Sequence, residues 1–225
     1  GEAVQVKIAL STVDVEGAKA SLQKEIPGWS FEKIRLLSKT KWNRILAKAD
    51  VEGSKDQKIN FYTAMYHLFI QPSNIADIDG RYRGPDDKVY LAENGIYYST
   101  LSLWDTYRAA HPLYTLMAPE RVDGFIQTMI QHQKIAGTLP IWTLWGKENY
   151  CMIGNHAIPV IADAYLKGFR GFDTADAWNA VKQTATVSHV NSDWKIYDQF
   201  GYYPFDIVER ESVSRTLESA YDDHC

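Results

Sequence analysis

The side chains best suited to chemistry lie in one stretch of the sequence, residues 139–165. Its first half is expected to be a loop and gathers, within ten residues, three aromatic rings, one acid and one thiol: Trp142, Trp145, Tyr150, Glu148 and Cys151. Aromatic rings suit the apolar faces of sugars, and an apolar wall raises the pKa of a carboxyl group because it removes water from the charged form. A carboxylic acid that protonates a glycosidic oxygen needs this environment. The pattern predicts a general acid at Glu148, and the alternative is a solvated loop acid beside core tryptophans.

A second motif, residues 102–108, reads Ser-Leu-Trp-Asp-Thr-Tyr-Arg and lies at the start of a predicted helix. On a helix, Trp104 and Arg108 share a face, and Asp105 lies beside them. Asp105 and Arg108 could bind sugar hydroxyls as a fork beneath the Trp104 ring. The alternative is structural: an acid that complements the helix dipole and pairs with an arginine.

Other polar residues offer weaker signals. His156 opens the next predicted helix and could be a general base or a sugar ligand, although a structural histidine is more common there. Glu211, in the first turn of the last predicted helix, either complements the dipole or offers an oxygen ligand to a hard cation. The pair at residues 222–223 lies at a helix end that disfavours negative charge, which hints at an outside partner unless water solvates it. Asp77 and Asp79 do not fit a calcium-binding EF-hand loop, so we predict a turn there.

Amphipathic stripes predict the helices that must position these residues. The predicted helices cover residues 18–26, 31–46, 56–70, 102–117, 119–136, a segment from 158, a segment after 173 and 213–221. Ser30 and Asp173 are predicted N-caps, Pro112 is expected to bend or break its helix, and Gly137 to end another. Short strands are expected near residues 4–10, 88–91 and 96–100, and a tyrosine-rich loop at 197–205. Helical hairpins of this kind form a bundle, a solenoid or an α/α toroid, and a toroid would gather scattered acids at one mouth.

Composition narrows the class of protein. The chain has 225 residues, 45% hydrophobic and 23% charged, which is ordinary for a globular protein with a large core. The net charge of −4 and the lack of Lys/Arg runs argue against a nucleic-acid partner. No apolar run is long enough for a membrane span, and the two cysteines do not fix a redox compartment. Seven Trp and fourteen Tyr favour an aromatic-lined carbohydrate site. The chain opens on Gly in a strand-like alternation and stops in helical register, so we expect it to be part of a larger protein.

Taken together, five segments resemble the calcium-dependent α-mannosidases of glycoside hydrolase family 92. They are FYTAMYHLFIQP, DIDGRYRG, SLWDTYRAAHPL, LPIWTLWGKENYCMIGNHAIPVIADAYLKGFRGFD and ESVSRTLESAYDD, in the order of the family. The resemblance implies a mainly α protein. Residues 1–14 would be the last strand of an N-terminal β-sandwich, 15–53 a helical linker, and 54–225 the first part of an (α/α)6 toroid.

The resemblance also implies roles for single residues. Glu148 occupies the position of the general acid in an inverting reaction, Asp105 would hold the terminal mannose, and Glu211 matches a carboxylate near sugar and Ca2+. The remaining residues expected to contact substrate are Trp104, Arg108, Trp142, Cys151, Gly154, His156 and Arg210. The implied substrates are mannose-terminated glycans, and the implied location is the periplasm or the cell exterior.

Departures from the family pattern limit these expectations. Thr143, Lys147 and Arg210 stand where the family commonly has Glu, Asn and His, which leaves the preferred linkage open. The family takes its base from a Gly-Asn-Asp-Asp segment that this chain lacks. We therefore expect the isolated chain to be inactive and to depend on the remainder of its polypeptide. The alternatives are a non-catalytic glycan-binding or scaffold module and an (α/α) glycosidase for another sugar.

Overall fold

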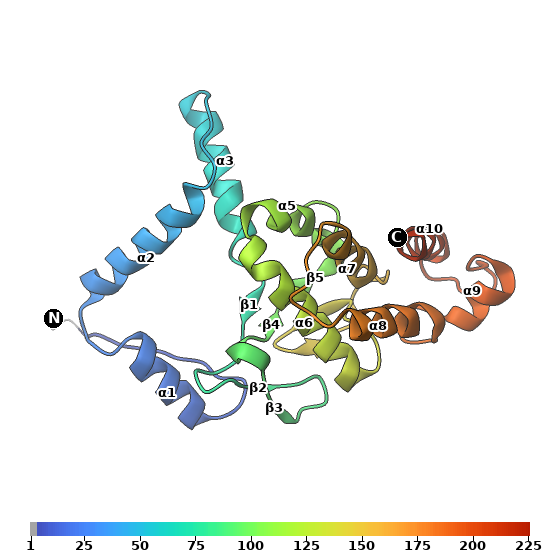
Figure 1. Cartoon of the computed structure of the whole chain (residues 1–225), viewed down its shortest axis with the longest axis horizontal. Helices are drawn as coiled ribbons and strands as arrows, with labels where there is room; N and C mark the ends of the chain where they lie inside the picture. The colour runs from blue at the N-terminus through green and yellow to red at the C-terminus, as the bar shows by residue number, and fades with distance from the viewer. Residues whose placement is uncertain (1–3) are drawn as a thin grey trace.

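The computed structural model describes residues 4–225 and is mainly helical, as the sequence predicts (Figure 1). The helices are α1 (Val15–Glu25), α2 (Phe31–Leu46), α3 (Lys55–Leu68), α4 (Leu103–Thr106), α5 (Ala110–Met117), α6 (Pro119–Ala136), α7 (Ala157–Leu166), α8 (Thr174–Thr186), α9 (Trp194–Phe200) and α10 (Ser212–His224). The short strands are β1 (Ser73–Asn74), β2 (Arg81–Arg83), β3 (Val89–Leu91), β4 (Tyr98–Ser99), β5 (Leu101–Ser102), β6 (Trp142–Leu144) and β7 (Lys147–Glu148), with a 3-10 turn η1 at Glu93–Gly95. In the described residues, none of these helices is long and apolar enough to cross a membrane.

The helix ends follow the predicted capping chemistry. The Ser30 hydroxyl accepts a hydrogen bond from the backbone N–H of Lys33, and the Asp173 carboxylate accepts from the first turn of α8. These caps satisfy N–H groups that have no partner within the helix. Gly137 ends α6 in the left-handed conformation, with φ of +90°.

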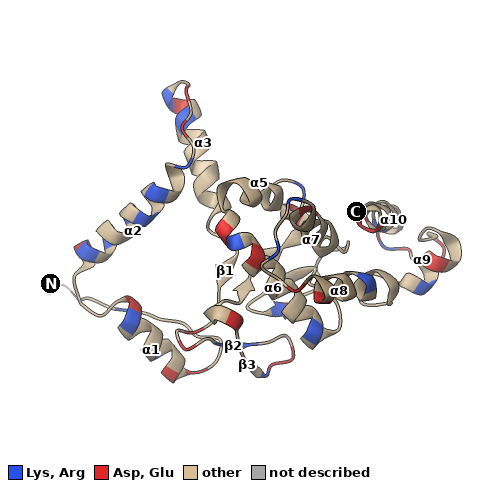
Figure 2. Cartoon of the chain, in the orientation of Figure 1, with Lys and Arg blue, Asp and Glu red and all other residues tan. Residues whose placement is uncertain are grey.

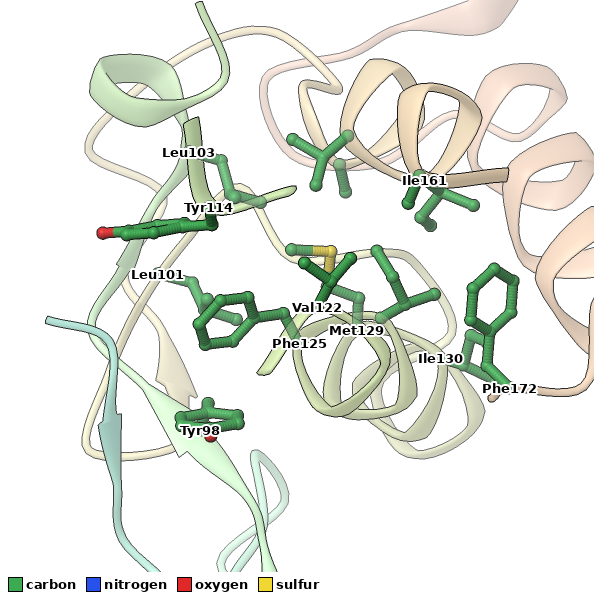
Figure 3. Close-up of a cluster of buried hydrophobic side chains, with 14 of the residues drawn as sticks. Tyr98, Leu101, Leu103, Tyr114, Val122, Phe125, Met129, Ile130, Ile161 and Phe172 are labelled. Carbon is green, nitrogen blue, oxygen red and sulfur yellow. The ribbon is translucent and has the colours of Figure 1, made fainter. Parts of the chain in front are cut away.

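The core surrounds α6, which contacts α5, α7 and α8. Its buried face carries the predicted stripe: Val122, Phe125, Ile126, Met129 and Ile130. In Figure 3 the side chains of this stripe point toward Leu101 and Tyr114 on one side and toward Ile161 and Phe172 on the other. A single apolar cluster therefore fixes the segments that carry the candidate site onto one support.

The N-terminal segment is attached to the loops beneath this core. The Ser11 hydroxyl lies 2.6 Å from a carboxylate oxygen of the buried Asp77, and the Arg83 guanidinium donates to the carbonyl oxygens of Thr12 (2.7 Å) and Val13 (2.9 Å). In contrast, α2 projects away from the body of the molecule with α3 (Figure 1) and has no buried residue. Basic residues recur along α2 (Figure 2), as expected for a helix open to water on most sides.

The strand predicted at residues 4–10 is not formed in the described part of the chain. The apolar side chains that alternate there remain exposed, Val4 at 83% and Ile8 at 76%. A strand needs a hydrogen-bonded neighbour, and none lies alongside residues 4–10 here, so the alternation alone does not produce one.

Two other predictions need correction. Residues 142–148, expected as loop, form the β6–β7 hairpin, and α9 extends over residues 197–200, the start of the segment expected as a tyrosine-rich loop. The segment predicted helical over 102–117 is broken, as expected, into two helices, α4 and α5, separated at residues 107–109. Pro112 explains the break, because its ring would clash with the carbonyl of Arg108 in a continuous helix, whereas the first turn of α5 tolerates it.

Candidate active site

A three-stranded sheet brings the two sequence motifs together. Strand β5 pairs with β6, with Ser102 opposite Trp142, and β6 pairs with β7, with Thr143 opposite Glu148. Because β5 runs directly into α4, the motif with Trp104 and Asp105 begins on one edge strand of this sheet, and Glu148 lies on the opposite edge strand, β7. Segments more than 40 residues apart in the sequence therefore meet at one end of the sheet.

Glu148 is half-buried, and its carboxylate is held by backbone N–H groups. One oxygen, Oε2, accepts from Ile141 at 2.6 Å and from Trp142 at 3.0 Å. The other, Oε1, accepts from Trp142 and Asn149 at 3.0 Å and from Tyr150 at 2.9 Å. The side chain thus stays inside the hairpin rather than extending into solvent, and backbone amides are the immediate partners of both oxygens.

Asp105 and Cys151 lie in the electrostatic neighbourhood of Glu148. Partial burial raises the pKa of the Cys151 thiol, and the negative charges of Glu148 and Asp105 raise it further. The same neighbourhood includes His189, which the sequence gave no reason to single out. Burial lowers the pKa of His189, while a hydrogen bond to the Val190 carbonyl and the charge of Glu148 act in the opposite direction.

His156 is completely buried between two carboxylates of α10. Its Nδ1 lies 2.8 Å from Asp222 Oδ1, and its Nε2 lies 3.1 Å from Glu218 Oε2. The ring stacks on Tyr107, with centroids 3.9 Å apart and planes 8° apart. Burial raises the pKa of Asp222, and the His156 contact opposes that shift.

The Trp104 and Arg108 side chains contact each other, but not on a shared helix face as predicted, because α4 ends at Thr106 and Arg108 lies in the turn that follows. The Arg108 guanidinium lies 4.7 Å from the centroid of the Trp104 ring, and it donates a hydrogen bond to the Trp104 carbonyl at 2.7 Å. The indole N–H of Trp104 donates to Glu218 Oε1 at 3.0 Å. Trp104 is half-buried and Asp105 is exposed, so the motif faces solvent and connects to the buried histidine through Glu218.

Gly154 has a structural reason to be glycine. Its φ is +83°, and a Cβ atom there would overlap the His156 ring and lie 2.9 Å from Glu218 Oε2. The family resemblance implied that Gly154 contacts substrate. In the structure Gly154 lies directly against the cluster of His156 and its carboxylates.

Glu211 and Arg210 lie farther out, before α10. The Arg210 side chain is 80% exposed, and Glu211 lies 3.6 Å from both Arg210 and Arg215. Arg215 also donates to Asn191, whose amide donates to the carbonyl oxygens of Tyr150 and Met152. Glu211 is therefore linked to the loop beside Cys151 through two intervening side chains.

The donor set around Glu211 does not fit a calcium ion. Ca2+ takes six to eight oxygen ligands, whereas Glu211 faces two guanidinium groups. Among residues 4–225, no group of three or more His, Cys, Asp or Glu side chains is placed to hold a metal ion.

Sequence reasoning missed Glu218 and Asp222 as site residues. Their spacing of four places them on one face of a helix, which is the only signal that the sequence offers. Their partners lie 62 to 114 residues away, so the cluster is visible only in three dimensions.

A sequence profile of the glycosyl hydrolase family 92 catalytic domain matches residues 17–225. A family GH92 alpha-mannosidase from Bacteroides thetaiotaomicron is 40% identical and superposes with a TM-score of 0.90, covering 96% of this chain and 29% of that chain. A structure of the same enzyme in complex with mannoimidazole matches equally well, with a TM-score of 0.90. A family GH92 inverting mannosidase from the same organism is 29% identical, with a TM-score of 0.86 over 95% of this chain and 30% of that chain.

A protein of Arthroderma benhamiae named "Uncharacterized secreted glycosidase" is 26% identical over 243 residues, covering 99% of this chain and 27% of the relative. The chain therefore spans less than a third of the length of these relatives.

Proposed function

Because the chain belongs to glycosyl hydrolase family 92, we propose that the full-length protein is an inverting, exo-acting α-mannosidase that removes terminal α-mannose from glycans. The observation that carries this proposal is the meeting of Glu148, Asp105 and Cys151 at one end of the β5–β6–β7 sheet, beside the Trp104–Glu218–His156 cluster. The mannoimidazole complex of the 40% identical relative supports mannose as the sugar.

In this proposal Glu148 is the general acid and donates a proton to the departing glycosidic oxygen. Both of its oxygens accept backbone hydrogen bonds in this structure. A proton can reach the substrate only if one oxygen gives up its amide partners. We therefore expect residues 149–150, which donate to Oε1, to shift when substrate binds, since catalytic hydrogen bonds often form only in the complex.

Inversion requires a second carboxylate that activates water, about 6.5–9.5 Å from the acid. We propose that this base is supplied by the remainder of the polypeptide, because the chain lacks the segment from which the family takes it. On this basis the isolated chain releases no mannose, whereas the full-length protein does.

We also propose that the full-length protein binds Ca2+ and acts outside the cytoplasm. The family resemblance implies Ca2+ with Glu211 as one ligand, but Glu211 faces two guanidinium groups in residues 4–225, so we propose Ca2+ for the full-length protein without assigning Glu211 to it. The Arthroderma benhamiae relative, named a secreted glycosidase, supports action outside the cell or in the periplasm.

The test of the general acid is Glu148→Gln in the full-length protein, assayed on an α-mannoside with a poor leaving group. We expect kcat to fall by about 100-fold or more, with KM little changed, because the amide cannot donate the proton. Glu209→Gln, an exposed glutamate before α10, is the matched control and should leave kcat unchanged. Near-normal turnover in Glu148→Gln would reject the assignment.

A second measurement separates a mannosidase from the alternatives. The full-length protein is incubated with mannobiose, with and without a chelator, and released mannose is measured. Release that stops on chelation supports the proposal. Binding without release identifies a glycan-binding module, and release that chelation does not affect contradicts the calcium part.

A further inference from the structure

Helix α10 presents two carboxylates one helical turn apart, and both face the same imidazole. Asp222 contacts Nδ1 of His156 and Glu218 contacts Nε2, and the three side chains are 0%, 15% and 1% exposed in the order Asp222, Glu218, His156. An acceptor lies opposite each ring nitrogen, so each contact must contain a proton. The imidazole is consequently fixed on both sides rather than free to rotate.

Each carboxylate uses its second oxygen to hold another segment. Asp222 Oδ2 accepts from the backbone N–H of Asn155 at 2.6 Å, which fixes the start of α7. Glu218 Oε1 accepts from the indole N–H of Trp104 at 3.0 Å, which fixes the ring on α4. Glu218 is thus the link between a buried, immobile histidine and a half-exposed tryptophan.

Holding that tryptophan has a physical consequence for ligand binding. When a ligand has to immobilise a partly exposed ring, the entropy lost by the ring weakens binding. A ring that is already held in place before the ligand arrives avoids this cost. Arg108 covers the ring as well, but it is itself exposed and is held by the Trp104 carbonyl and the Tyr107 ring. The charge-assisted hydrogen bond from Glu218 is the stronger restraint on the indole plane.

We propose that Glu218 is a positioning residue that orients the Trp104 ring as the surface on which the sugar stacks, with Asp222 and His156 as its buried anchor. This inference rests on the proposed function, since it takes Trp104 to be a sugar-binding residue. It assigns Glu218 a role through Trp104 and none in proton transfer.

The kinetic test uses Glu218→Ala, Glu218→Gln and Trp104→Phe in the full-length protein. We expect Glu218→Ala and Trp104→Phe each to raise KM about tenfold with kcat within about twofold, because stacking stabilises ground state and transition state alike. The double variant should be no worse than either single variant, since both remove one interaction. Glu218→Gln should stay within about threefold of wild type, because its amide can accept the indole N–H and donate to His156.

A protein that is merely destabilised behaves differently. It loses active molecules, so the apparent kcat falls while KM stays constant, and that pattern in Glu218→Ala would overturn the proposal. A KM for Glu218→Gln as high as for Glu218→Ala would overturn it too.

A spectroscopic readout separates this proposal from the proposed function. In protein labelled with 15N-tryptophan, the Trp104 indole resonance is the one missing from Trp104→Phe. It should move upfield in Glu218→Gln, as the acceptor loses its charge, and should not move in the control Glu209→Gln. If the wild-type protein releases no mannose, the proposed function fails and this resonance alone decides: movement supports positioning by Glu218, and no movement overturns it.

Discussion

Gly154 lies immediately before the buried Asn155–His156 pair, and its backbone has φ of +83°. Two separate restrictions apply there. The left-handed conformation disfavours any side chain, and the space that a Cβ would occupy is already filled by the His156 ring. Gly137 has nearly the same conformation, with φ of +90°, but nothing lies within 4 Å of the Cβ position. A comparison of alanine substitutions at the two glycines therefore separates the cost of backbone strain from the cost of steric overlap.

We predict that Gly154→Ala lowers the free energy of unfolding more than Gly137→Ala does. Gly137→Ala should cost about 1–2 kcal/mol, the strain of a left-handed alanine. Gly154→Ala should cost about 1–3 kcal/mol more, because the histidine–carboxylate cluster must move. Urea unfolding of both variants measures the difference, and equal losses would show that the cluster yields without cost.

The candidate site could be predicted from the sequence only in part, for reasons visible at single residues. The spacing of Trp104 and Arg108 within one short motif predicted that the two side chains lie together, and they do, although Arg108 lies in the turn after α4 and not on the helix. Glu218 and Asp222 were missed because their partners lie on α4 and at the start of α7, and no local pattern records a contact across 60 residues or more. The backbone amides that hold Glu148 were missed because residues 142–148 were expected to be loop, and only the β6–β7 hairpin directs those N–H groups inward.

Helices α6 and α2 show what a periodic apolar stripe does and does not establish. Both stripes predicted their helix correctly, and on α6 every residue of the stripe is buried. On α2 no residue is buried, and Phe31 and Leu37 are 69% and 49% exposed. Periodicity determines which residues share a face, whereas the packing of other elements determines whether that face is covered. The predicted strand at residues 4–10 fails for the same reason.

This difference predicts unequal costs for similar truncations. Ile126→Ala on α6 removes a side chain that is 0% exposed and should lower the free energy of unfolding by about 2–5 kcal/mol. Leu37→Ala on α2 should change it by no more than about 0.5 kcal/mol. Chemical denaturation of the two variants measures both values. A loss above about 2 kcal/mol for Leu37→Ala would show that the α2 stripe is covered in solution.

At the scale of the whole molecule, the core contains two histidines that are held neutral. His111 on α5 packs edge-on to Tyr114 and Phe125, and His132 on α6 is 2% exposed. Burial lowers the pKa of each to about 4. Asp223 has the opposite effect on how stability depends on pH. Burial, and then the charge of Asp222, raise its pKa to about 6, so its contribution to stability is lost as the pH rises. A pH profile of the wild type therefore sums opposing contributions, and a single histidine is best isolated by comparing a variant with the wild type.

We predict that His132→Leu reduces the sensitivity of the fold to acid. Between pH 6.5 and pH 4 the unfolded chain binds a proton at His132 and the folded chain does not, so the free energy of unfolding falls as the pH falls through this window. Each unit of pKa difference corresponds to about 1.4 kcal/mol. The fold should therefore lose about 3 kcal/mol of stability through His132 as the pH falls across this window. The variant has no imidazole and does not lose this stability. Between pH 7.5 and pH 4, the unfolding free energy of His132→Leu relative to wild type should therefore rise by about that amount.

Urea unfolding at half-unit pH steps measures this difference, with Gln133→Leu on the same helix as the control. Gln133 carries no titratable group, so its replacement should displace the stability curve without changing its slope. Parallel curves for His132→Leu and wild type would mean that the folded chain takes up the proton at His132 as readily as the unfolded chain does. The imidazole would then have to reach water or an acidic partner, which contradicts its burial on the core side of α6.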